Sequence, residues 1–278
     1  MDEKGLGQRL QAARRAAGFT QQELCQETGL SYSTLAKIER GAIKSPSIFT
    51  IQQIAAALNT SVDELISGDA PVGRKKQSKR GITFVYFDIN GCLVQFYQRT
   101  FGLIAADTGI PSDIVEATYV QYNDAVCKGI MSLDDFNQTL GRSFNVENFD
   151  WSNYYLDAIT SIAGMAELVE WTSKHYKIGL LSNIMPGLID SMMQRGLIPK
   201  LPYDAIIDSS EVKLIKPDPA IFQVAEQKAG APPNEILLVD DTKLNVTMAE
   251  RAGWHSIWFN DYDPADSAQR VREALEFS

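Results

Sequence analysis

The sequence predicts two domains of different fold class. The first is a small all-α domain of five helices, and the second is an α/β domain with a doubly wound parallel sheet and an inserted α-helical cap. Two observations support this prediction. Apolar residues recur at helical spacing in five short bursts before residue 67, and strand-like apolar runs alternate with helical segments after residue 81. A chain of 278 residues is long enough to build both domains.

A polar stretch separates the two patterns. Residues 68–81, GDAPVGRKKQSKRG, combine Gly, Pro and Ser with five basic residues and show no apolar periodicity. This composition is typical of an exposed linker. We therefore expect one domain at residues 1–68, a basic flexible linker at 69–81, and a second domain at 82–278.

Each helix of the first domain is indicated by apolar residues that recur three or four positions apart. Five short helices are expected. The bursts that mark them are Leu6, Leu10 and Ala13; Leu24 with Cys25; Leu35 and Ile38; Ile51, Ile54 and Leu58; and Val62, Leu65 and Ile66.

Residues 20–41, TQQELCQETGLSYSTLAKIERG, carry the start and stop signals of two helices joined by a tight turn. Thr20 is suited to cap the first helix, Gly29 to end it, and Ser31 to cap the second. We expect two short helices that cross at a steep angle, as in a helix-turn-helix.

This stretch, together with SIFTIQQIAAALNTSVDELI downstream, resembles the helix-turn-helix domains of the phage repressor and Cro family over roughly residues 5–66. The resemblance implies a homodimer that binds a double-stranded DNA operator through a recognition helix at residues 31–40. The alternative is that these are only the solvated residues of a small helical domain. The residues implied to bind DNA are Ser31 at the helix start, Tyr32, Ser33 and Lys37 at base edges, and Gln21 and Arg40 at phosphates.

The second domain is expected to form its strands at residues 82–89, 177–183, 235–241 and 255–260. Parallel sheets of this kind bind ligands in a crevice at the carboxyl ends of their strands. The polar residues expected to meet in that crevice are Asp88, Ser182, Asn183, Lys216, Asp240 and Asp241.

This set of side chains suits phosphoryl transfer. Carboxylate oxygens are the ligands that Mg²⁺ prefers, and Asp88 with Asp241 can supply them. Lys216 and Ser182 would hold a phosphate, and Asp88 would attack it to form an aspartyl phosphate. Taken alone, each is better explained structurally, Ser182 and the pair of Asp240 and Asp241 as helix caps and Lys216 as a solvated side chain, so the prediction depends on the whole set.

These positions, in this order along the chain, resemble the four motifs of the haloacid dehalogenase superfamily over roughly residues 82–262, and KPDPAIF is a typical context for its third motif. The resemblance implies a Rossmann-like sheet, a Mg²⁺ cofactor, a phosphorylated small-molecule ligand or substrate, and a helical cap at about residues 95–163. It implies catalytic roles for Asp88, Asn90, Ser182 and Lys216, phosphate binding by Ser182, Asn183, Lys216 and Gly91, and metal binding by Asp88, Asn90, Asp240 and Asp241.

Aromatic residues are frequent in the expected cap. They are suited to line a pocket for an apolar or ring-containing ligand, although we expect most of them only to pack the cap. They are Phe96, Tyr97, Phe101, Tyr119, Tyr122, Phe136, Trp151, Tyr154 and Tyr155.

Asn90 departs from the superfamily pattern. In its phosphatases the residue two beyond the nucleophile is a second aspartate that exchanges protons, and an amide has no usable pKa for that exchange. Three explanations stay open: a natural pseudoenzyme that senses a ligand, a slow phosphatase with another proton carrier, or an active enzyme with an engineered substitution. Superfamily dehalogenases also lack this aspartate but use no magnesium, so the Asp240 and Asp241 pair makes dehalogenation a distant third hypothesis.

Charge and cysteine content indicate the kind of partner and the cellular compartment that suit the protein. Residues 1–80 carry 12 basic and 8 acidic residues, a net charge of +4. Because the whole chain has a net charge of −9, residues 81–278 carry a net charge of −13. Only the first domain is therefore suited to bind a polyanion. Three widely spaced cysteines predict no disulfide framework, and the sequence shows no signal core or membrane span. We therefore expect a cytoplasmic protein with no membrane partner.

The sequence as a whole predicts a DNA-binding transcriptional regulator with a Mg-dependent phosphatase-like domain that senses or slowly hydrolyses a phosphorylated small molecule. The alternative is an active phosphatase with a phosphoaspartyl mechanism, in which the helix-turn-helix serves localisation or autoregulation and Asn90 is an engineered or tolerated change.

Overall fold

The computed structural model describes residues 3–58, 62, 65, 78–95 and 98–275, which form two compact units, Met1–Lys76 and Gln77–Ser278. The greater part of the predicted linker, residues 69–77, falls outside the described residues. None of the helices in the described part of the chain combines the length and apolar character needed to span a membrane.

The first unit is helical, as predicted. Its core contains Leu10, Leu24, Leu35 and Ile54, each from a different helix and each almost fully buried. The predicted fifth helix, around residues 62–66, lies largely outside the described residues. The helices are α1 (Glu3–Ala16), α2 (Gln21–Thr28), α3 (Tyr32–Glu39) and α4 (Ile48–Ala57).

The second unit contains a five-stranded parallel sheet in the order β3-β2-β1-β4-β5, which confirms the predicted fold class. The strands are β1 (Phe84–Phe87), β2 (Lys177–Ser182), β3 (Ala205–Asp208), β4 (Ile236–Asp240) and β5 (His255–Trp258). Four of them match the predicted runs, whereas β3 was not predicted. Its four residues, AIID, are too short an apolar run to stand out from the loop around them.

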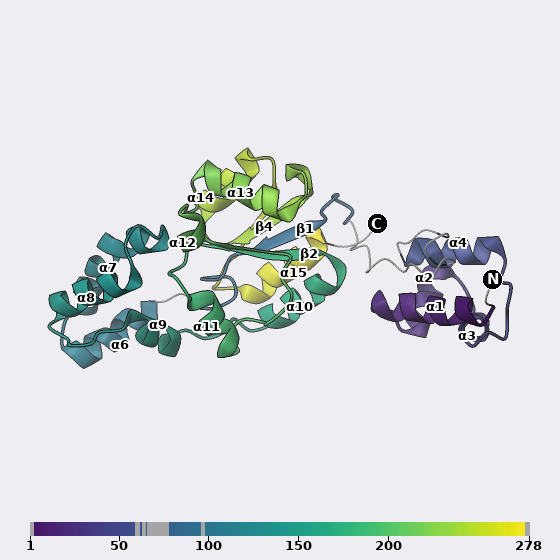
Figure 1. Ribbon diagram of the computed structural model, residues 1–278, viewed down its shortest axis with the longest axis horizontal. Coiled ribbons are helices and arrows are strands. Elements are labelled where there is room, and N and C mark those ends of the chain that lie inside the picture. The colour runs from purple at the N-terminus through teal and green to yellow at the C-terminus, as the bar shows by residue number, and fades with distance from the viewer. Residues whose placement is uncertain (1–2, 59–61, 63–64, 66–77, 96–97, 276–278) are drawn as a thin grey trace. The chain divides into compact units, whose positions relative to one another are not determined.

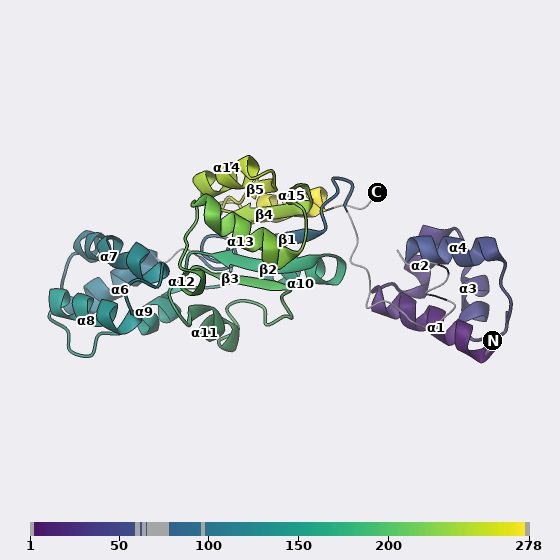
Figure 2. The same cartoon turned by 45° about the horizontal axis from the view of Figure 1, so that its top comes forward.

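Helices cover both faces of the sheet (Figures 1 and 2). Successive residues of β1 point to opposite faces, so Phe84 and Tyr86 pack in one core cluster while Val85 and Phe87 pack in the other. The first cluster includes α13 (Pro219–Ala229) and α14 (Lys243–Arg251), and the second includes α10 (Met165–His175), α11 (Leu188–Gln194) and α15 (Pro264–Ala274).

Of the described helices between β1 and β2 in the sequence, the first four form a separate group at one end of the sheet (Figure 1), and the last, α10, packs on the sheet. Their core is aromatic: Tyr119 stacks on Trp151 with ring centroids 4.3 Å apart, and Phe101 and Phe136 surround the pair. These cap helices are α6 (Gln98–Thr108), α7 (Ser112–Cys127), α8 (Leu133–Phe144) and α9 (Trp151–Ala158). The short helices α12 (Ser209–Val212) and η1 (Pro233–Glu235) connect parts of the sheet domain.

Candidate active site and DNA-binding surface

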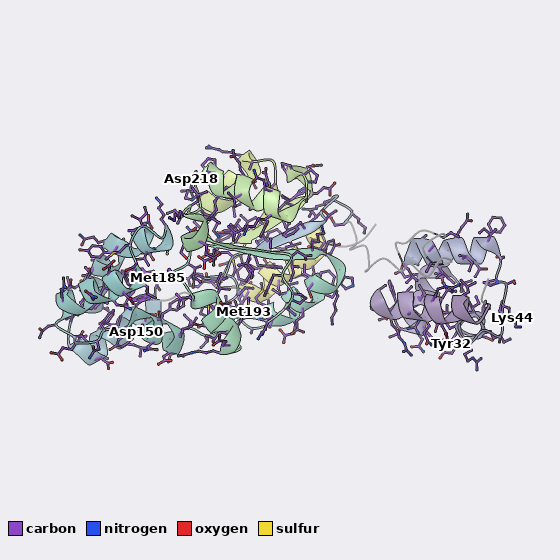
Figure 3. The ribbon with its side chains drawn as sticks, viewed as in Figure 1. Tyr32, Lys44, Asp150, Met185, Met193 and Asp218 are labelled. Atoms are coloured by element: carbon purple, nitrogen blue, oxygen red, sulfur yellow. The ribbon has the colours of Figure 1, made fainter. Side chains whose placement is uncertain are left out.

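A cavity of about 160 Å³ lies at the carboxyl ends of β1, β2 and β4, where the sequence predicts a ligand crevice. Asp88 follows β1, Asp241 follows β4, and Lys216 comes from the segment between α12 and α13. Met185, just after β2, lies between the cap helices and the sheet and also lines the cavity (Figure 3). The structure therefore brings together residues that are more than 150 positions apart.

Lys216 is buried at the centre of this cluster. Its Nζ lies 2.5 Å from Oδ2 of Asp240 and 3.0 Å from Oδ2 of Asp88. Burial by itself lowers the pKa of the ammonium, but the two carboxylates outweigh burial and hold the pKa above its ordinary value. Lys216 is therefore a permanent cation at the floor of the site.

Asp240 is engaged by several neighbours. Besides Lys216, it accepts hydrogen bonds at Oδ1 from the backbone N–H of Thr242 at 2.8 Å and from Nδ2 of Asn245 at 3.0 Å. Because these donors occupy both of its oxygens, the carboxylate serves to orient Lys216 and the first turn of α14. Asp240 also contributes one oxygen to a group of three neighbouring carboxylates, and its role as a metal ligand stays a prediction.

Asp88 and Asp241 remain as carboxylates whose charge is not fully balanced. Burial, partly offset by Lys216, raises the pKa of Asp88 to about 6, and burial with the nearby Asp88 charge raises the pKa of Asp241 to about 7. One oxygen from each of Asp88, Asp240 and Asp241 lies within 4.8 Å of the others. Such a cluster of hard oxygen ligands fits a divalent cation, which would favour the ionised carboxylates.

Gly91 makes room for this cluster. Its φ is +78°, and a Cβ at this position would lie 2.1 Å from Oδ2 of Asp241. Both the left-handed backbone and the close approach of Asp241 require glycine here.

Ser182 and Asn183 end β2 beside Lys216 but act differently. The Ser182 hydroxyl is buried and lies near enough to Asp88 to favour its ionised form, yet no complete hydrogen bond to it forms within the described residues. The Asn183 amide donates to the Lys216 carbonyl at 2.8 Å and accepts from the Lys216 N–H at 2.7 Å. Ser182 thus has a buried hydroxyl beside Asp88 without a complete hydrogen bond, whereas Asn183 chiefly positions Lys216.

Asn90 is held by a residue of the cap. The hydroxyl of Tyr155, on α9, donates a 2.5 Å hydrogen bond to Oδ1 of Asn90. The carbonyl end of the amide is therefore occupied, and its two N–H donors remain for the cavity that Asn90 lines.

Only some of the cap aromatics reach the cavity, as expected. Tyr119, Trp151 and Tyr155 line it together with Asn123 and Cys127. Phe101 and Phe136 are buried in the cap core, and Phe96 and Tyr97 lie outside the described residues.

In the helical unit, the structure confirms the predicted caps. Thr20 and Glu23 form a reciprocal capping box at the start of α2, Gly29 ends α2 with φ +67°, and the Ser31 hydroxyl accepts from the Thr34 N–H at the start of α3. A buried ion pair between Arg14 and Glu39, at 2.6 Å, fastens α3 to α1. The caps define the ends of α2 and α3, and the ion pair holds α3 against α1.

The side chains predicted to read bases lie on the outer surface of α3. Tyr32 is 55% exposed, and Ser33 and Lys37 are exposed as well. Figure 3 marks Tyr32 at the start of α3 and Lys44 in the segment that follows this helix. Two predicted phosphate contacts also have partners within the unit: Gln21 donates to Glu39 at 2.8 Å, and Arg40 donates to the Ala36 carbonyl at 3.1 Å.

Comparison with known proteins identifies both units. Residues 82–253, more than half of the chain, match the haloacid dehalogenase-like hydrolases. The chain belongs to this hydrolase family. Residues 10–65 match the helix-turn-helix family, so the N-terminal unit is a helix-turn-helix DNA-binding domain.

The relatives of the two domains are different proteins. The HTH-type transcriptional regulator YazB of Bacillus subtilis is 44% identical over 59 residues, which are 21% of this chain and 84% of YazB. Pyrimidine 5'-nucleotidase YjjG of Escherichia coli is 22% identical over 183 residues, 64% of this chain and 81% of that enzyme. The (S)-2-haloacid dehalogenase of Pseudomonas sp. is 28% identical over 108 residues, and this chain spans only 46% of its length.

Solved structures of the hydrolase family share the fold. A HAD family enzyme from Bacteroides thetaiotaomicron, in complex with magnesium and inorganic phosphate, has a TM-score of 0.55 at 18% identity, covering 64% of this chain and 93% of that one. A HAD-like family hydrolase from Porphyromonas gingivalis has a TM-score of 0.54 at 22% identity, covering 69% and 98%.

Asn245 and Asn123 are contributors to the candidate site that the sequence does not predict, and Tyr155 is predicted only as one of several cap aromatics suited to line a pocket. Asn245 lies in the first turn of α14, five residues after Asp240 at the end of β4, and no helical periodicity connects the two positions. Tyr155 and Asn123 come from the cap, and nothing local in the sequence distinguishes them from the packing residues around them.

Proposed function

We propose that this protein is a DNA-binding transcriptional regulator whose hydrolase domain binds Mg²⁺ and a phosphorylated small molecule, which it senses or hydrolyses slowly. The observation that carries the proposal is the pairing of a complete Asp88, Lys216 and Asp241 cluster with an amide, Asn90, where a proton carrier is needed. Binding chemistry is retained, and acid/base chemistry is weakened.

The residues of the site fit a magnesium ion. Asp88, Asp241 and the backbone carbonyl of Asn90 would hold it, with Asp240 orienting Lys216 beside them. When bound, Mg²⁺ would neutralise charge on a phosphate ester and favour the ionised form of both carboxylates. The Bacteroides structure, which contains magnesium and inorganic phosphate in the same fold, supports this assignment.

Phosphate recognition would use the floor of the cavity. Lys216 supplies a fixed positive charge, and the Ser182 hydroxyl is a buried donor without a complete hydrogen bond in the described part of the chain. A buried hydroxyl without a hydrogen-bond partner costs free energy unless a ligand supplies that partner. The backbone N–H of Gly91 is not available, because it donates to the Val94 carbonyl at 2.9 Å.

Asn90 would limit turnover while it supports binding. Its carbonyl oxygen accepts from Tyr155, so its amino group is the end presented to a phosphate ester. An amide cannot protonate the leaving group, and loss of such help costs on the order of 100 to 10,000-fold in rate. Asp88 keeps the position of the nucleophile, so a slow phosphoaspartyl reaction remains compatible with this site.

In the DNA-binding domain, Tyr32, Ser33 and Lys37 would contact base edges, since they are exposed along α3. Gln21 and Arg40 would contact phosphates from the two ends of the motif. A homodimer would place two such helices on half-sites about one helical turn apart.

The alternative function is that of an active phosphatase whose DNA-binding domain directs localisation or autoregulation. The intact nucleophile position, Asp88, and the raised pKa values of Asp88 and Asp241 are compatible with it. Dehalogenation, the activity of one of the relatives, is less well supported because the acidic cluster favours a metal.

One paired experiment separates these functions. Full-length protein is assayed for Mg²⁺-dependent hydrolysis of p-nitrophenyl phosphate and for dehalogenation of 2-chloropropionate, and the same preparation is used to select DNA from a random pool. The regulator proposal expects an enriched operator and hydrolysis far below that of an efficient phosphatase. Rapid turnover with no enriched sequence would support the alternative, and release of chloride would support dehalogenation.

A further inference from the structure

The part of the cavity lining that comes from cap helix α7 contains an amide whose oxygen is engaged by two neighbours. Oδ1 of Asn123 accepts a 2.6 Å hydrogen bond from the Tyr119 hydroxyl and a 3.4 Å contact from the Cys127 thiol. The three residues are spaced four apart on α7, so one face of the helix holds the group together. Burial raises the pKa of Cys127 to about 12, which keeps its proton on sulfur.

This arrangement leaves the amino group of Asn123 as a donor. Both neighbours occupy its carbonyl oxygen, and Asn123 is part of the cavity lining with Tyr119 and Cys127. Asn90 shows the same pattern with Tyr155 on the other side of the cavity. In each case a tyrosine hydroxyl occupies the amide oxygen, so the cavity receives N–H donors from both asparagines.

The charges around the cavity restrict the group that Asn123 binds. Among the described residues that line it, the ionised groups are Asp88, Asp241 and Lys216, and the lysine is already paired with two carboxylates. A second anionic group on the ligand, near Asn123, would find no free cation there. An uncharged oxygen acceptor matches a neutral N–H donor without this desolvation cost.

The volume of the cavity restricts the size of the ligand. It measures about 160 Å³, close to the roughly 150 Å³ of a cavity that holds benzene. A phosphate with a chain of a few heavy atoms fits this space. A nucleoside monophosphate, which adds a pentose and a base, exceeds this volume and would have to extend through the open side of the cavity, although one relative is a pyrimidine nucleotidase.

We propose that the ligand is a small phosphorylated compound with an uncharged carbonyl oxygen on its non-phosphate part, and that the Asn123 amino group binds this oxygen. The proposal rests on the proposed function of the site and adds the substrate class. Tyr119 acts as a positioning residue, because it holds the amide with its N–H donors available.

Two nearly isosteric probes test this proposal. Hydroxyacetone phosphate has a carbonyl where isobutyl phosphate has an apolar branch, and inorganic phosphate reports the floor of the site alone. Dissociation constants are measured by calorimetry on the full chain with Mg²⁺. We expect hydroxyacetone phosphate to bind about five- to tenfold more tightly than isobutyl phosphate, the effect of one neutral hydrogen bond.

Variants assign the preference to Asn123. Asn123→Leu should reduce the ratio of the two dissociation constants, isobutyl phosphate over hydroxyacetone phosphate, to about one without weakening the binding of inorganic phosphate. Tyr119→Phe should reduce this ratio in part, because the amide loses the hydrogen bond that orients it. Gln121→Leu, on the exposed side of the same helix, is the matched control and should keep the full ratio. Thermal unfolding shows that each variant is folded.

Several results would overturn the proposal. Equal binding of the two esters by the unmodified protein, or a preference that survives Asn123→Leu, removes the role of Asn123. Tighter binding of phosphoglycolate than of hydroxyacetone phosphate shows that the acceptor is charged, and tighter binding of uridine monophosphate than of hydroxyacetone phosphate contradicts the proposed class of small ligand. If inorganic phosphate with Mg²⁺ does not bind at all, the proposed function fails together with this inference.

Discussion

Tyr155 on cap helix α9 donates a 2.5 Å hydrogen bond to Asn90, the residue that stands where phosphatases of this family carry their proton-transferring aspartate. The contact joins two positions 65 residues apart, one in the cap and one beside Asp88, the proposed nucleophile. It fixes the orientation of the amide and links the position of the cap to the reacting end of the site. The chemistry at position 90 and the contact from position 155 are therefore best tested together.

Replacing the amide should restore turnover. Asn90→Asp should raise the kcat for p-nitrophenyl phosphate by about 100 to 10,000-fold, because it supplies the missing acid and base. Affinity for Mg²⁺ should change much less, since the new group acts mainly in the transition state. Asp88→Asn in the same background should abolish the gain.

A chemical control belongs with this experiment. Asn90 precedes Gly91, and deamidation of such a pair would create aspartate in aged protein, so fresh protein is checked by peptide mass spectrometry. A folded Asn90→Asp variant that binds Mg²⁺ but hydrolyses no phosphate ester across a broad panel would contradict the slow-phosphatase interpretation and leave binding alone.

Tyr155 should tune the acid introduced by Asn90→Asp. A phenol that donates to a carboxylate favours its charged form and lowers its pKa. Adding Tyr155→Phe to that variant should therefore shift the alkaline limb of the pH–kcat profile upward, because the carboxyl group stays protonated to higher pH. A profile that keeps its shape and loses only amplitude would mean that Tyr155 acts through packing. Tyr154→Phe, whose hydroxyl bonds Asp107 instead, is the control.

The sequence predicted the residues of the catalytic cluster better than the contacts that orient them. Asp88, Ser182, Lys216 and Asp241 follow or lie near strand ends, and parallel topology brings such positions together. The orientation of Asn183 toward the Lys216 backbone depends on a loop geometry with no periodic signal. Its predicted role in phosphate binding is thus replaced, in our proposal, by support of Lys216.

The remaining gaps have a similar origin. Strand β3 is only four residues long, and its pairing with β2 rather than its composition makes it a strand. Tyr155 was counted among nine cap aromatics, and only the packing of α9 against the sheet domain selects it as the partner of Asn90. Long-range side-chain contacts of this kind leave no local pattern in a single sequence.

Magnesium should stabilise the protein more at high pH than at low pH. Burial raises the pKa of Asp88 from 3.8 to about 6 and that of Asp241 from 3.8 to about 7, so the folded, metal-free protein binds protons more tightly than the unfolded chain. This contribution to stability is lost as pH rises from about 4 to 7. At high pH both carboxylates are ionised and repel each other, and bound Mg²⁺ relieves this repulsion. The gain in Tm on adding Mg²⁺ should therefore be several degrees larger at pH 8 than at pH 5.

Asp241→Asn is the variant that checks the source of this effect. It removes a carboxyl group that has a raised pKa and is also a proposed metal ligand. In thermal unfolding of the hydrolase domain, the dependence of Tm on Mg²⁺ and part of its dependence on pH should therefore disappear. An equal gain in Tm at both pH values in the unmodified protein would show that these carboxylates do not titrate with metal binding.

The DNA-binding residues should separate into two classes. Tyr32→Ala or Lys37→Ala should remove about 1–3 kcal/mol of preference for the selected operator and weaken binding to random DNA only slightly, as expected for base contacts. Arg40→Ala should weaken binding to both kinds of DNA and reduce its salt dependence. Gln22→Ala, exposed on α2, is the control in the same gel-shift titration. Equal losses on operator and random DNA for Tyr32→Ala would remove it from the base-reading set.

Occupation of the hydrolase site should change operator affinity if that domain is a sensor. A ligand shifts DNA binding only when it binds the DNA-competent and incompetent states with different affinity, and the coupling is equal in both directions. We expect hydroxyacetone phosphate with Mg²⁺ to change the operator Kd by about five-fold or more, within the usual range of allosteric coupling. The operator should change the Kd of that ligand by the same factor.

Asp241→Asn should abolish both changes and leave the ligand-free operator Kd as it is, because position 241 lies outside the DNA-binding domain. A saturating ligand that leaves the operator Kd unchanged would refute the sensor role and favour the alternative, in which the helix-turn-helix domain only localises a phosphatase.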